Sequence, residues 1–210
     1  MPDKLDYKKE YKDIYLPPKK PVIIDVPQIN YIMVDGKGAP EGEEYQAAMS
    51  VMYSISFTIK MSKMNGMQPD GYFDYVTPPL EGLWGGKNGF DITRRDTWEW
   101  TSMIRLPEFV TPDVFKWAVA SVREKKPEVK VEKARFEAFK EGLCVQIMHI
   151  GPYAREPESV ALMHKFMEEN GLADMTGPVR RHHEIYLGDP RKTKPENLRT
   201  VLRLPVERVR

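Results

Sequence analysis

The same order of sequence patterns occurs twice along this chain of 210 residues. Each time, a strand-like segment ends at a glycine, a helical pattern follows, and two more strand-like segments are joined by a loop that contains proline. The two closing strands carry matching tetrads, Ile-Arg-Leu-Pro at Ile104–Pro107 and Leu-Arg-Leu-Pro at Leu202–Pro205. A four-residue match arises easily by chance, whereas a shared order over about a hundred residues does not. The pattern therefore predicts a tandem duplication.

This duplication predicts an α+β fold that consists of a tandem βαββ repeat. The sequence places a helical N-terminal extension at residues 1–20 and the main domain at residues 21–210, with repeat one at 21–110, a linker helix at 111–126 and repeat two at 133–206. One helix covers only one face of a small antiparallel sheet, so two such units can join their open faces on a pseudo-twofold axis. Because pockets form where units meet, we expect a central ligand cleft.

Local periodicity predicts the individual helices and strands. Apolar residues at helical spacing indicate helices at 43–63, 111–126 and 156–170. Thr111 is a suitable N-cap, with Pro112 in the first turn, and Asn65-Gly66 ends the first of these helices. Alternating apolar residues indicate strands over six segments: 22–38, in two pieces broken by Pro27, 71–84, 98–106, 134–151 as one or two strands, the stretch around Glu184, and 199–206.

Composition excludes several classes of function. The 32 basic residues nearly balance the 31 acidic ones, which argues against sequence-independent binding to nucleic acid. No run of about eighteen apolar residues could cross a membrane, and the charged N-terminus lacks the apolar middle of a secretion signal. We therefore expect a cytoplasmic location. The single Cys144 agrees with a reducing compartment, and its apolar strand pattern predicts a buried, inert thiol.

The segment Arg180–Pro190 holds the leading candidate for a functional side chain. Its alternation predicts a strand that ends in a Gly-Asp-Pro turn. Side chains alternate across a strand, so His182, Glu184 and Tyr186 share one face, while His183, Ile185 and Leu187 share the other. If the aliphatic set packs inward, Glu184 lies on the opposite face, toward the predicted cleft.

Aromatic residues are dense in the segments that would border this cleft. They are Tyr72, Tyr75, Trp84, Trp98, Trp100, Tyr153 and Tyr186. A carboxylate among rings loses hydration, which raises the pKa of such a group. It can pair with a lipophilic cation, helped by roughly 0.5–2 kcal/mol of cation-π attraction. It can also act as a general base on water, because a base works best with a pKa near the working pH.

Five segments together resemble the GyrI-like small-molecule-binding family. They are GKG before the first long helix, EGLWG, IGPY before the helix of the second half, HHEIYLGDPRKT and the closing LRLP. The resemblance runs from about Pro21 to Val206 and is most specific in HHEIYLGDPRKT. It implies a tandem βαββ fold with a glutamate, here Glu184, in a central pocket. The chain resembles the stand-alone members rather than those fused to a DNA-binding module, so we expect no direct binding of nucleic acid and no contact with membranes.

The resemblance also implies a range of activities. The family includes effector-binding domains of multidrug-responsive regulators, and some stand-alone members hydrolyse cyclopropane-containing compounds. We therefore expect a hydrophobic or cationic small molecule as partner, with hydrolysis of a cyclopropanone or cyclopropane electrophile as one outcome. In that reaction Glu184 would take a proton from the attacking water, and Tyr153 would donate a hydrogen bond to the developing oxyanion. The rings around the substrate would be Trp84, Trp100 and Tyr186, with Tyr72, Tyr75 and Trp98 as further ligand-binding candidates.

Other interpretations stay open at this point. The chain could sequester a drug or sense an effector without catalysis, or it could bind DNA gyrase, as the gyrase-inhibitory member of the family does. A glutamate on an exposed strand face is commonly just solvated, and large rings such as Trp98 and Trp100 fill cores as well as sites. No organic cofactor is required, and the histidines show no spacing typical of a zinc site, so we expect no metal.

Overall fold

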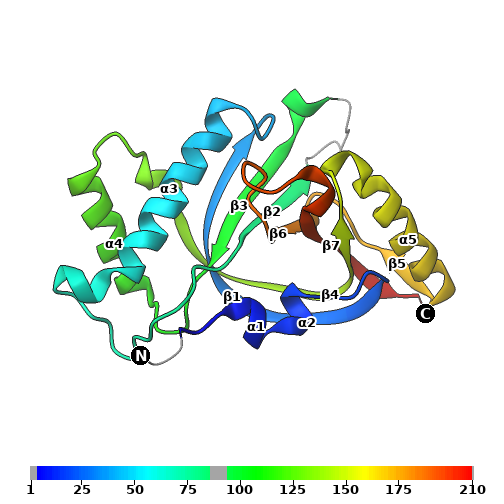
Figure 1. Ribbon diagram of the computed structural model, residues 1–210, viewed down its shortest axis with the longest axis horizontal. Coiled ribbons are helices and arrows are strands. Elements are labelled where there is room, and N and C mark those ends of the chain that lie inside the picture. The colour runs from blue at the N-terminus through cyan, green and yellow to red at the C-terminus, as the bar shows by residue number, and fades with distance from the viewer. Residues whose placement is uncertain (1–3, 86–93, 210) are drawn as a thin grey trace. The chain divides into compact units, whose positions relative to one another are not determined.

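The computed structural model describes residues 4–85 and 94–209 as a mixed α+β protein (Figure 1). The chain forms two compact units, and each unit draws on three separate stretches of sequence. Unit 1 comprises Met1–Glu10, Ile29–Pro78 and Asp91–Phe139, and unit 2 comprises Tyr11–Gln28, Pro79–Phe90 and Lys140–Arg210. The glycine-rich loop of the sequence, after Gly85, lies largely outside the described residues. No helix within the described ranges is both long enough and apolar enough to span a bilayer.

Unit 1 packs two long helices beside a pair of antiparallel strands. Strand β1 (Val22–Lys37) enters from unit 2, and its second part pairs with β3 (Glu99–Arg105) from Tyr31 opposite Arg105 to Lys37 opposite Glu99. Helices α3 (Glu43–Lys60) and α4 (Pro112–Lys125) lie side by side (Figure 1). The short elements of this unit are α1 (Tyr7–Glu10), η1 (Ser62–Asn65), η2 (Arg95–Thr97) and η3 (Val131–Lys133).

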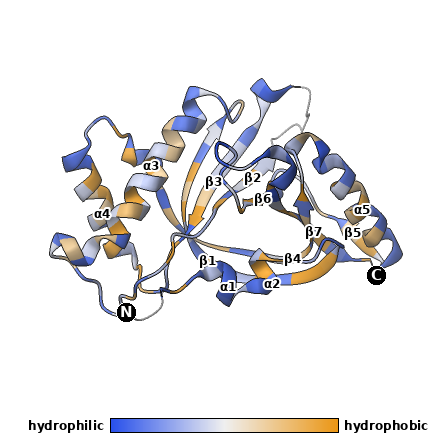
Figure 2. Ribbon diagram, viewed as in Figure 1, coloured by the Kyte–Doolittle hydropathy of each residue, from blue (hydrophilic) through white to orange (hydrophobic). Residues whose placement is uncertain are grey.

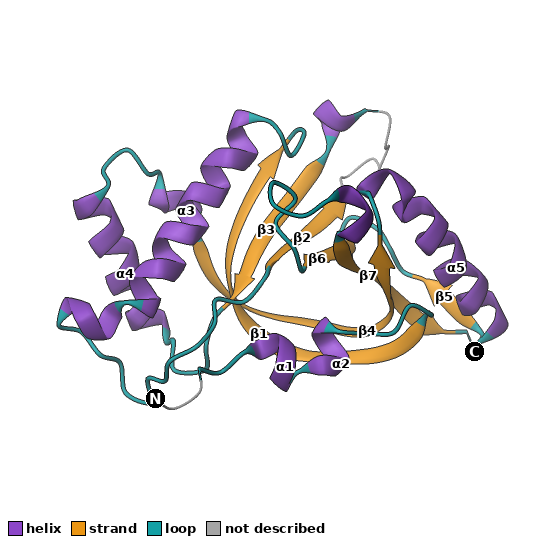
Figure 3. Ribbon diagram, viewed as in Figure 1, coloured by secondary structure: helices purple, strands orange, loops and turns teal. Residues whose placement is uncertain are grey.

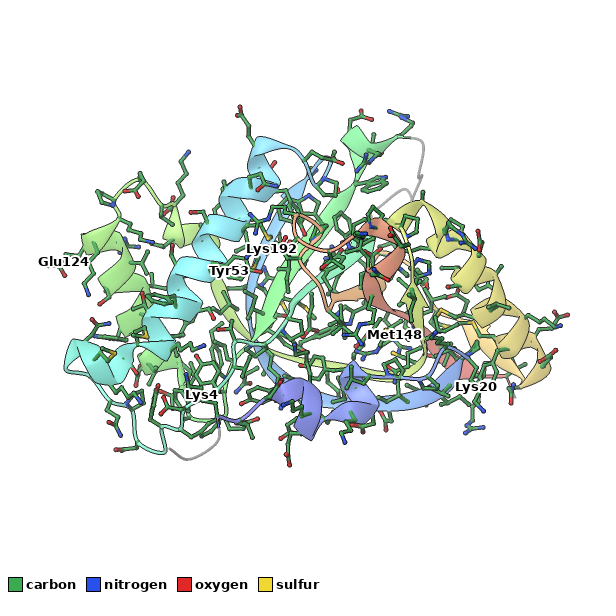
Figure 4. All side chains as sticks on the ribbon, viewed as in Figure 1. Lys4, Lys20, Tyr53, Glu124, Met148 and Lys192 are labelled. Atoms are coloured by element: carbon green, nitrogen blue, oxygen red, sulfur yellow. The ribbon has the colours of Figure 1, made fainter. Side chains whose placement is uncertain are left out.

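Helix α4 illustrates how the sequence defines its own helices. The hydroxyl of Thr111 accepts a 3.3 Å hydrogen bond from the backbone N–H of Val114, and Pro112 opens the first turn, as predicted. Residues at helical spacing are buried, among them Ala118 and Val122. The polar side of the helix faces solvent: Glu124 projects away from it (Figure 4), and hydrophilic and hydrophobic residues alternate along it (Figure 2).

Unit 2 is built around strand β7 (Arg199–Arg208), which pairs antiparallel with three other strands (Figure 3). These are β4 (Arg135–Ile150), β5 (Leu172–Asp174) and β6 (His182–Tyr186). Strand β2 (Leu80–Gly85) pairs antiparallel with the other edge of β6. Helix α5 (Glu156–Glu169) packs along β5, and the short elements are α2 (Lys12–Tyr15), η4 (Tyr153–Arg155) and η5 (Pro195–Asn197).

The core of unit 2 joins one face of α5 to the strands. Met163 and Met167 of the helix pack against alternate residues of β4 and β7, and the whole cluster comprises Val145, Ile147, Met163, Met167, Leu172, Leu202, Leu204 and Val206. Alternate residues of β4 and β7 face α5, whose methionines lie one turn apart, although the residues between them on these strands are buried as well.

The predicted strand at residues 71–84 is wrong over its first nine residues. Regular pairing begins only at Leu80, while Tyr75 forms an isolated parallel bridge with Leu5. Gly71 has φ of 73°, and Pro78 and Pro79 lack the N–H groups that a ladder needs. The middle strand of the first half is therefore β2, rather than the segment that starts at Tyr72.

Two other strand predictions also need correction. Strand β1 is continuous rather than broken at Pro27, whose side chain is exposed; a strand tolerates proline where its N–H is not required by a neighbour. The three-residue β5 has no alternation to identify it and was not predicted. It follows Gly171, whose φ of 61° is typical of a glycine just after a helix.

Candidate functional site

Strand β6 presents Glu184 as its alternation predicts. His183 and Ile185 on one face are fully buried, with 0% of their surface exposed, and the side chain of Glu184 on the opposite face is 12% exposed. Across the two neighbouring strands, Glu184 lies opposite Gly82 of β2 and Leu202 of β7. The carboxylate is thus held on the central strand of three and is largely shielded from water.

A chain of hydrogen bonds orients this carboxylate. The indole N–H of Trp84 donates to the hydroxyl of Tyr186 at 2.8 Å, and that hydroxyl donates to Oε2 of Glu184 at 2.7 Å. Nε2 of His182 lies 3.2 Å from Oε1 of the same carboxylate. Because the Tyr186 oxygen accepts from Trp84, its single hydrogen is directed at Glu184. Each carboxylate oxygen still has a lone pair with which to accept a proton from a ligand or a water molecule.

Tyr153 is close to this chain of hydrogen bonds, as the sequence predicts. Its ring meets the ring of Tyr186 edge to face, with centroids 6.1 Å apart. Partial burial, together with the nearby carboxylates of Glu156 and Glu184, raises the pKa of Tyr153 to about 12. Four sequence-predicted site residues therefore lie together in unit 2: Trp84, Tyr153, Glu184 and Tyr186.

A second carboxyl group, that of Glu156, belongs to the same site and was missed by sequence reasoning. Burial, and then the charge of Glu184, raise the pKa of Glu156 to about 9. Its Oε1 is buried and has no hydrogen-bond partner among the described residues. An acidic residue in the first turn of a helix is so common that it attracts no notice in a sequence. The only available signal was its spacing of three residues from Tyr153 of the IGPY segment.

The other four aromatic candidates belong to unit 1. Trp100 is 1% exposed, donates from Nε1 to the carbonyl of Gly38 at 3.2 Å, and packs edge-on against Tyr45. It lies so close to Gly36 that a Cβ atom there would overlap its six-membered ring. This arrangement is that of a core tryptophan, one of the two roles that the sequence leaves open.

Tyr72, Tyr75 and Trp98 have their own surroundings in unit 1. The hydroxyl of Tyr72 donates to the carbonyl of Lys60 at 2.8 Å, and Tyr72 helps to line an open groove of about 750 Å³. Tyr75 is 2% exposed, and burial raises its pKa. Trp98 is partly exposed, with the guanidinium of Arg95 located 5.2 Å from its ring centroid.

Behind Glu184, on the buried face of β6, lies an ionic cluster. His183 makes ion pairs of 3.0 Å with both Glu81 and Glu141, and Nη1 of Arg203 donates to Glu141 at 2.7 Å. Burial alone would lower the pKa of His183, but the two carboxylates raise it to about 9. Burial alone would raise the pKa of Glu141, but Arg203 and His183 lower it to about 2. His183, Glu141 and Arg203 are therefore charged near neutral pH, and they pair with one another.

This cluster was only partly foreseen. The sequence groups His183 with aliphatic neighbours. For Arg203 it leaves two alternatives, a solvated edge or the binding of a structural carboxylate, and Arg203 is 0% exposed and paired with Glu141. Arg203 also donates to the backbone carbonyl of Ile14 at 3.0 Å, which ties the segment after α1 to β7. The cluster fixes the backbone of β6 immediately beside Glu184.

The candidate site holds groups for acid–base chemistry. Within the described residues, no three histidine, cysteine, aspartate or glutamate side chains gather in a way that could hold a metal ion. Cys144 is buried, and burial raises the pKa of its thiol, which confirms that it is not a nucleophile poised for reaction. What the arrangement provides is one oriented carboxylate, one carboxyl with a raised pKa and three aromatic rings.

Comparison with known proteins identifies the family to which the chain belongs. A sequence model of the GyrI-like small molecule binding domain matches residues 19–207. A Listeria innocua structure described as a hydrolase is 51% identical, with a TM-score of 0.90, over 97% of this chain and 100% of that one. Another, described as an uncharacterized conserved protein from Listeria innocua, is 53% identical, with a TM-score of 0.94, over 97% and 100%.

A more distantly related structure shows similarity of the fold alone. The C-terminal domain of EcmrR has a TM-score of 0.54 at 12% identity, over 90% of this chain and 98% of that domain. No curated protein matches the sequence.

Proposed function

This chain belongs to the GyrI-like small-molecule-binding family, and from that premise we propose that it binds a hydrophobic small molecule at Glu184 and hydrolyses it. The observation that carries the proposal is the hydrogen-bonded chain from Trp84 through Tyr186 to a carboxylate that is only 12% exposed. A surface glutamate without a function has no need of such orientation. The likeness to a Listeria innocua protein described as a hydrolase supports the hydrolytic step.

The substrate class that we propose is a strained cyclopropane or cyclopropanone electrophile. Glu184 accepts a proton from a water molecule as that water attacks the strained carbon. Because Tyr186 and His182 fix both carboxylate oxygens, the base needs little reorganisation when the reaction begins. The rings of Trp84, Tyr153 and Tyr186 supply the apolar surface that holds the substrate and reduces the access of bulk water.

Product analysis tests this function directly. Purified protein is incubated with a cyclopropanone-type probe, and the addition of water is followed by mass spectrometry. We expect Glu184→Gln, which keeps the size of the side chain and removes its basicity, to lose about 100-fold or more of the turnover. The matched control is Glu168→Gln, which changes an exposed glutamate of α5. Undiminished turnover in Glu184→Gln would exclude Glu184 as the base.

The second candidate function is binding of a cationic molecule without turnover. It is favoured by the same carboxylate beside aromatic rings, which together attract lipophilic cations. In that case Glu184→Gln weakens the binding of a cationic dye more than the binding of a neutral dye of equal size. If the substitution weakens the binding of both dyes equally and the protein consumes the cyclopropanone-type probe, the protein is better described as a hydrolase.

We also propose that the fold arose by tandem duplication of a βαββ unit. Support comes from the order β1, α3, β2, β3, which is matched by β4, α5, β6, β7 once β5 is set aside. The first tetrad begins in the last two residues of β3, the second lies within β7, and their arginines both bind carboxylates. Arg105 donates to Glu108 at 2.9 Å, and Arg203 donates to Glu141 at 2.7 Å.

A further inference from the structure

We propose that Glu156 is the proton donor of this site: it presents a carboxylic-acid hydrogen to an acceptor oxygen of the bound molecule and transfers it as that molecule reacts. The inference rests on the proposed function of Glu184 and deepens it, since it adds the acid to the base. The strained substrates of the proposed function that carry a conjugated carbonyl have the acceptor oxygen that such a donor requires.

The two carboxyl groups of the site differ in the hydrogen bonds that the protein makes to their oxygens. Glu184 accepts a hydrogen bond at Oε2 from Tyr186, and Nε2 of His182 lies 3.2 Å from its Oε1. Glu156 begins helix α5, and its buried Oε1 receives no hydrogen bond from the described residues. Buried polar atoms in folded proteins are rarely left without a partner, and the exceptions gather at functional sites. A ligand oxygen that accepts a hydrogen bond from the Glu156 carboxyl would give this group the partner that it lacks.

Glu156 carries a proton near neutral pH in this proposal. Two carboxylates in a site of low polarity repel each other, which disfavours ionisation of the more buried one. Burial, and then the charge of Glu184, raise the pKa of Glu156 to about 9. Glu156 is therefore a carboxylic acid at pH 7, able to donate a hydrogen bond.

The other polar groups around Glu156 do not supply that proton better. They are Tyr153 on η4, Thr200 on β7, whose hydroxyl acts to lower the pKa of Glu156, and the solvent-exposed pair Arg155 and Glu158 on either side of Glu156 in sequence. Tyr153 is the alternative donor that the sequence suggests. Its pKa is raised to about 12, which makes it a far weaker acid near neutral pH than Glu156.

The proposed step balances as an addition of water. One oxygen–carbon bond forms as water attacks the strained carbon, and one carbon–carbon bond of the three-membered ring breaks. The electron pair of the broken bond moves to the conjugated carbonyl oxygen, which takes the proton of Glu156, while Glu184 takes a proton from the water. Glu184 then returns its proton to Glu156 through solvent, so neither an oxidant nor a reductant is consumed.

The decisive experiment compares the pH dependence of kcat and KM in three proteins with a cyclopropane probe conjugated to a carbonyl. In the wild type, kcat falls about tenfold per pH unit above pH 9, because the donor proton is lost there. Glu156→Gln keeps an N–H donor but cannot release a proton, so we expect kcat to fall about 100-fold or more, KM to change little, and the alkaline decline to disappear. Glu158→Gln, two residues away and exposed, is the matched control and should behave as the wild type. The proposal would be overturned if Glu156→Gln had the same kcat as the wild type and the same decline of kcat at alkaline pH.

A second measurement does not depend on turnover. Infrared difference spectroscopy at pH 7 should detect the carbonyl stretch of a protonated carboxylic acid in the wild type and in Glu158→Gln, and its loss in Glu156→Gln. Absence of this band from the wild type would refute the inference even if the protein is a hydrolase. The proposed function fails separately, when Glu184→Gln retains turnover, so the two failures are distinguishable.

Discussion

Gly82 and Glu184 lie directly opposite each other on neighbouring strands, and the missing side chain of the glycine leaves room for the groups that orient the carboxylate. A Cβ atom on Gly82 would lie 2.9 Å from Nε1 of Trp84 and 3.4 Å from the hydroxyl of Tyr186. The glycine of the EGLWG segment therefore has a steric role, because it permits the indole to reach Tyr186.

The first prediction is that Gly82→Ala disrupts the site without unfolding unit 2. The new methyl group displaces the indole of Trp84 and breaks its hydrogen bond to Tyr186, which is worth about 1 kcal/mol or somewhat more. We expect about tenfold weaker ligand binding and altered tryptophan fluorescence. The control is Gly177→Ala, where the nearest atom is 4.0 Å from the new Cβ. Equal binding by both variants would show that the Trp84 hydrogen bond does not matter to the ligand.

The second prediction separates core tryptophans from surface ones in unit 1. Trp100→Ala should destabilise the protein by about 3–5 kcal/mol, because it removes a fully buried ring. Trp98→Ala, at the partly exposed tryptophan two residues earlier, should cost about 1 kcal/mol. Urea unfolding followed by circular dichroism measures both changes. Similar losses in the two variants would contradict the core assignment of Trp100.

The third prediction concerns how Glu156, the proposed acid, changes the free energy of unfolding with pH. The folded protein keeps Glu156 protonated up to about pH 9, whereas the unfolded chain releases this proton near the ordinary value of 4.5. The contribution of this group to stability therefore falls as the pH rises from 4.5 to 9. Glu156→Gln abolishes this dependence, so the variant should be more stable than the wild type at pH 8 and should lose that advantage near pH 4.

Thermal unfolding across this pH range provides the measurement. Glu158→Gln is again the control, since the pKa of that exposed glutamate is lowered by Arg155 rather than raised. A constant difference between Glu156→Gln and the wild type at every pH would mean that Glu156 is not protonated in the folded state.

The fourth prediction concerns the buried ionic cluster. Arg203→Met removes the partner of Glu141 and leaves a buried carboxylate without its main counter-charge, which should cost about 3–5 kcal/mol. Arg199→Met changes an exposed arginine of the same strand and should change the free energy of unfolding by less than about 0.5 kcal/mol. Chemical denaturation measures both values. A loss below about 1 kcal/mol in Arg203→Met would show that Arg203 contributes no more than an exposed ion pair.

Local features of the fold were predictable because they depend on near neighbours in sequence. The Thr111 cap, the helical stripes and the alternation of β6 were all confirmed. The predicted strand does not form over residues 71–79, because Gly71 has a positive φ and the segment contains two prolines. An alternation of apolar residues does not take these two features into account. The mixed α+β class followed from these elements, and the family followed from the motifs.

The site was predictable only in part. Glu184, Tyr186, Trp84 and Tyr153 could be proposed because they occupy recognisable motifs or strand faces. Glu156 could not, because its raised pKa comes from burial and from the charge of a residue 28 positions away in sequence. The ionic role of His183 was likewise missed, and for Arg203 only packing decided between a solvated edge and a structural carboxylate partner.

The amino-acid sequence by itself determined where helices and strands form and which side of β6 faces inward, because periodicity and capping act over a few residues. Tertiary structure alone decided which ionisable groups share a low-polarity environment, because that depends on distances between segments far apart in the chain. Glu184 acquires its orientation from Trp84 and Tyr186, and the pKa of Glu156 is raised by burial and by the charge of Glu184. Electrostatic interactions strengthen where water is excluded, so the chemistry of these carboxyl groups arises only once the chain has folded around them.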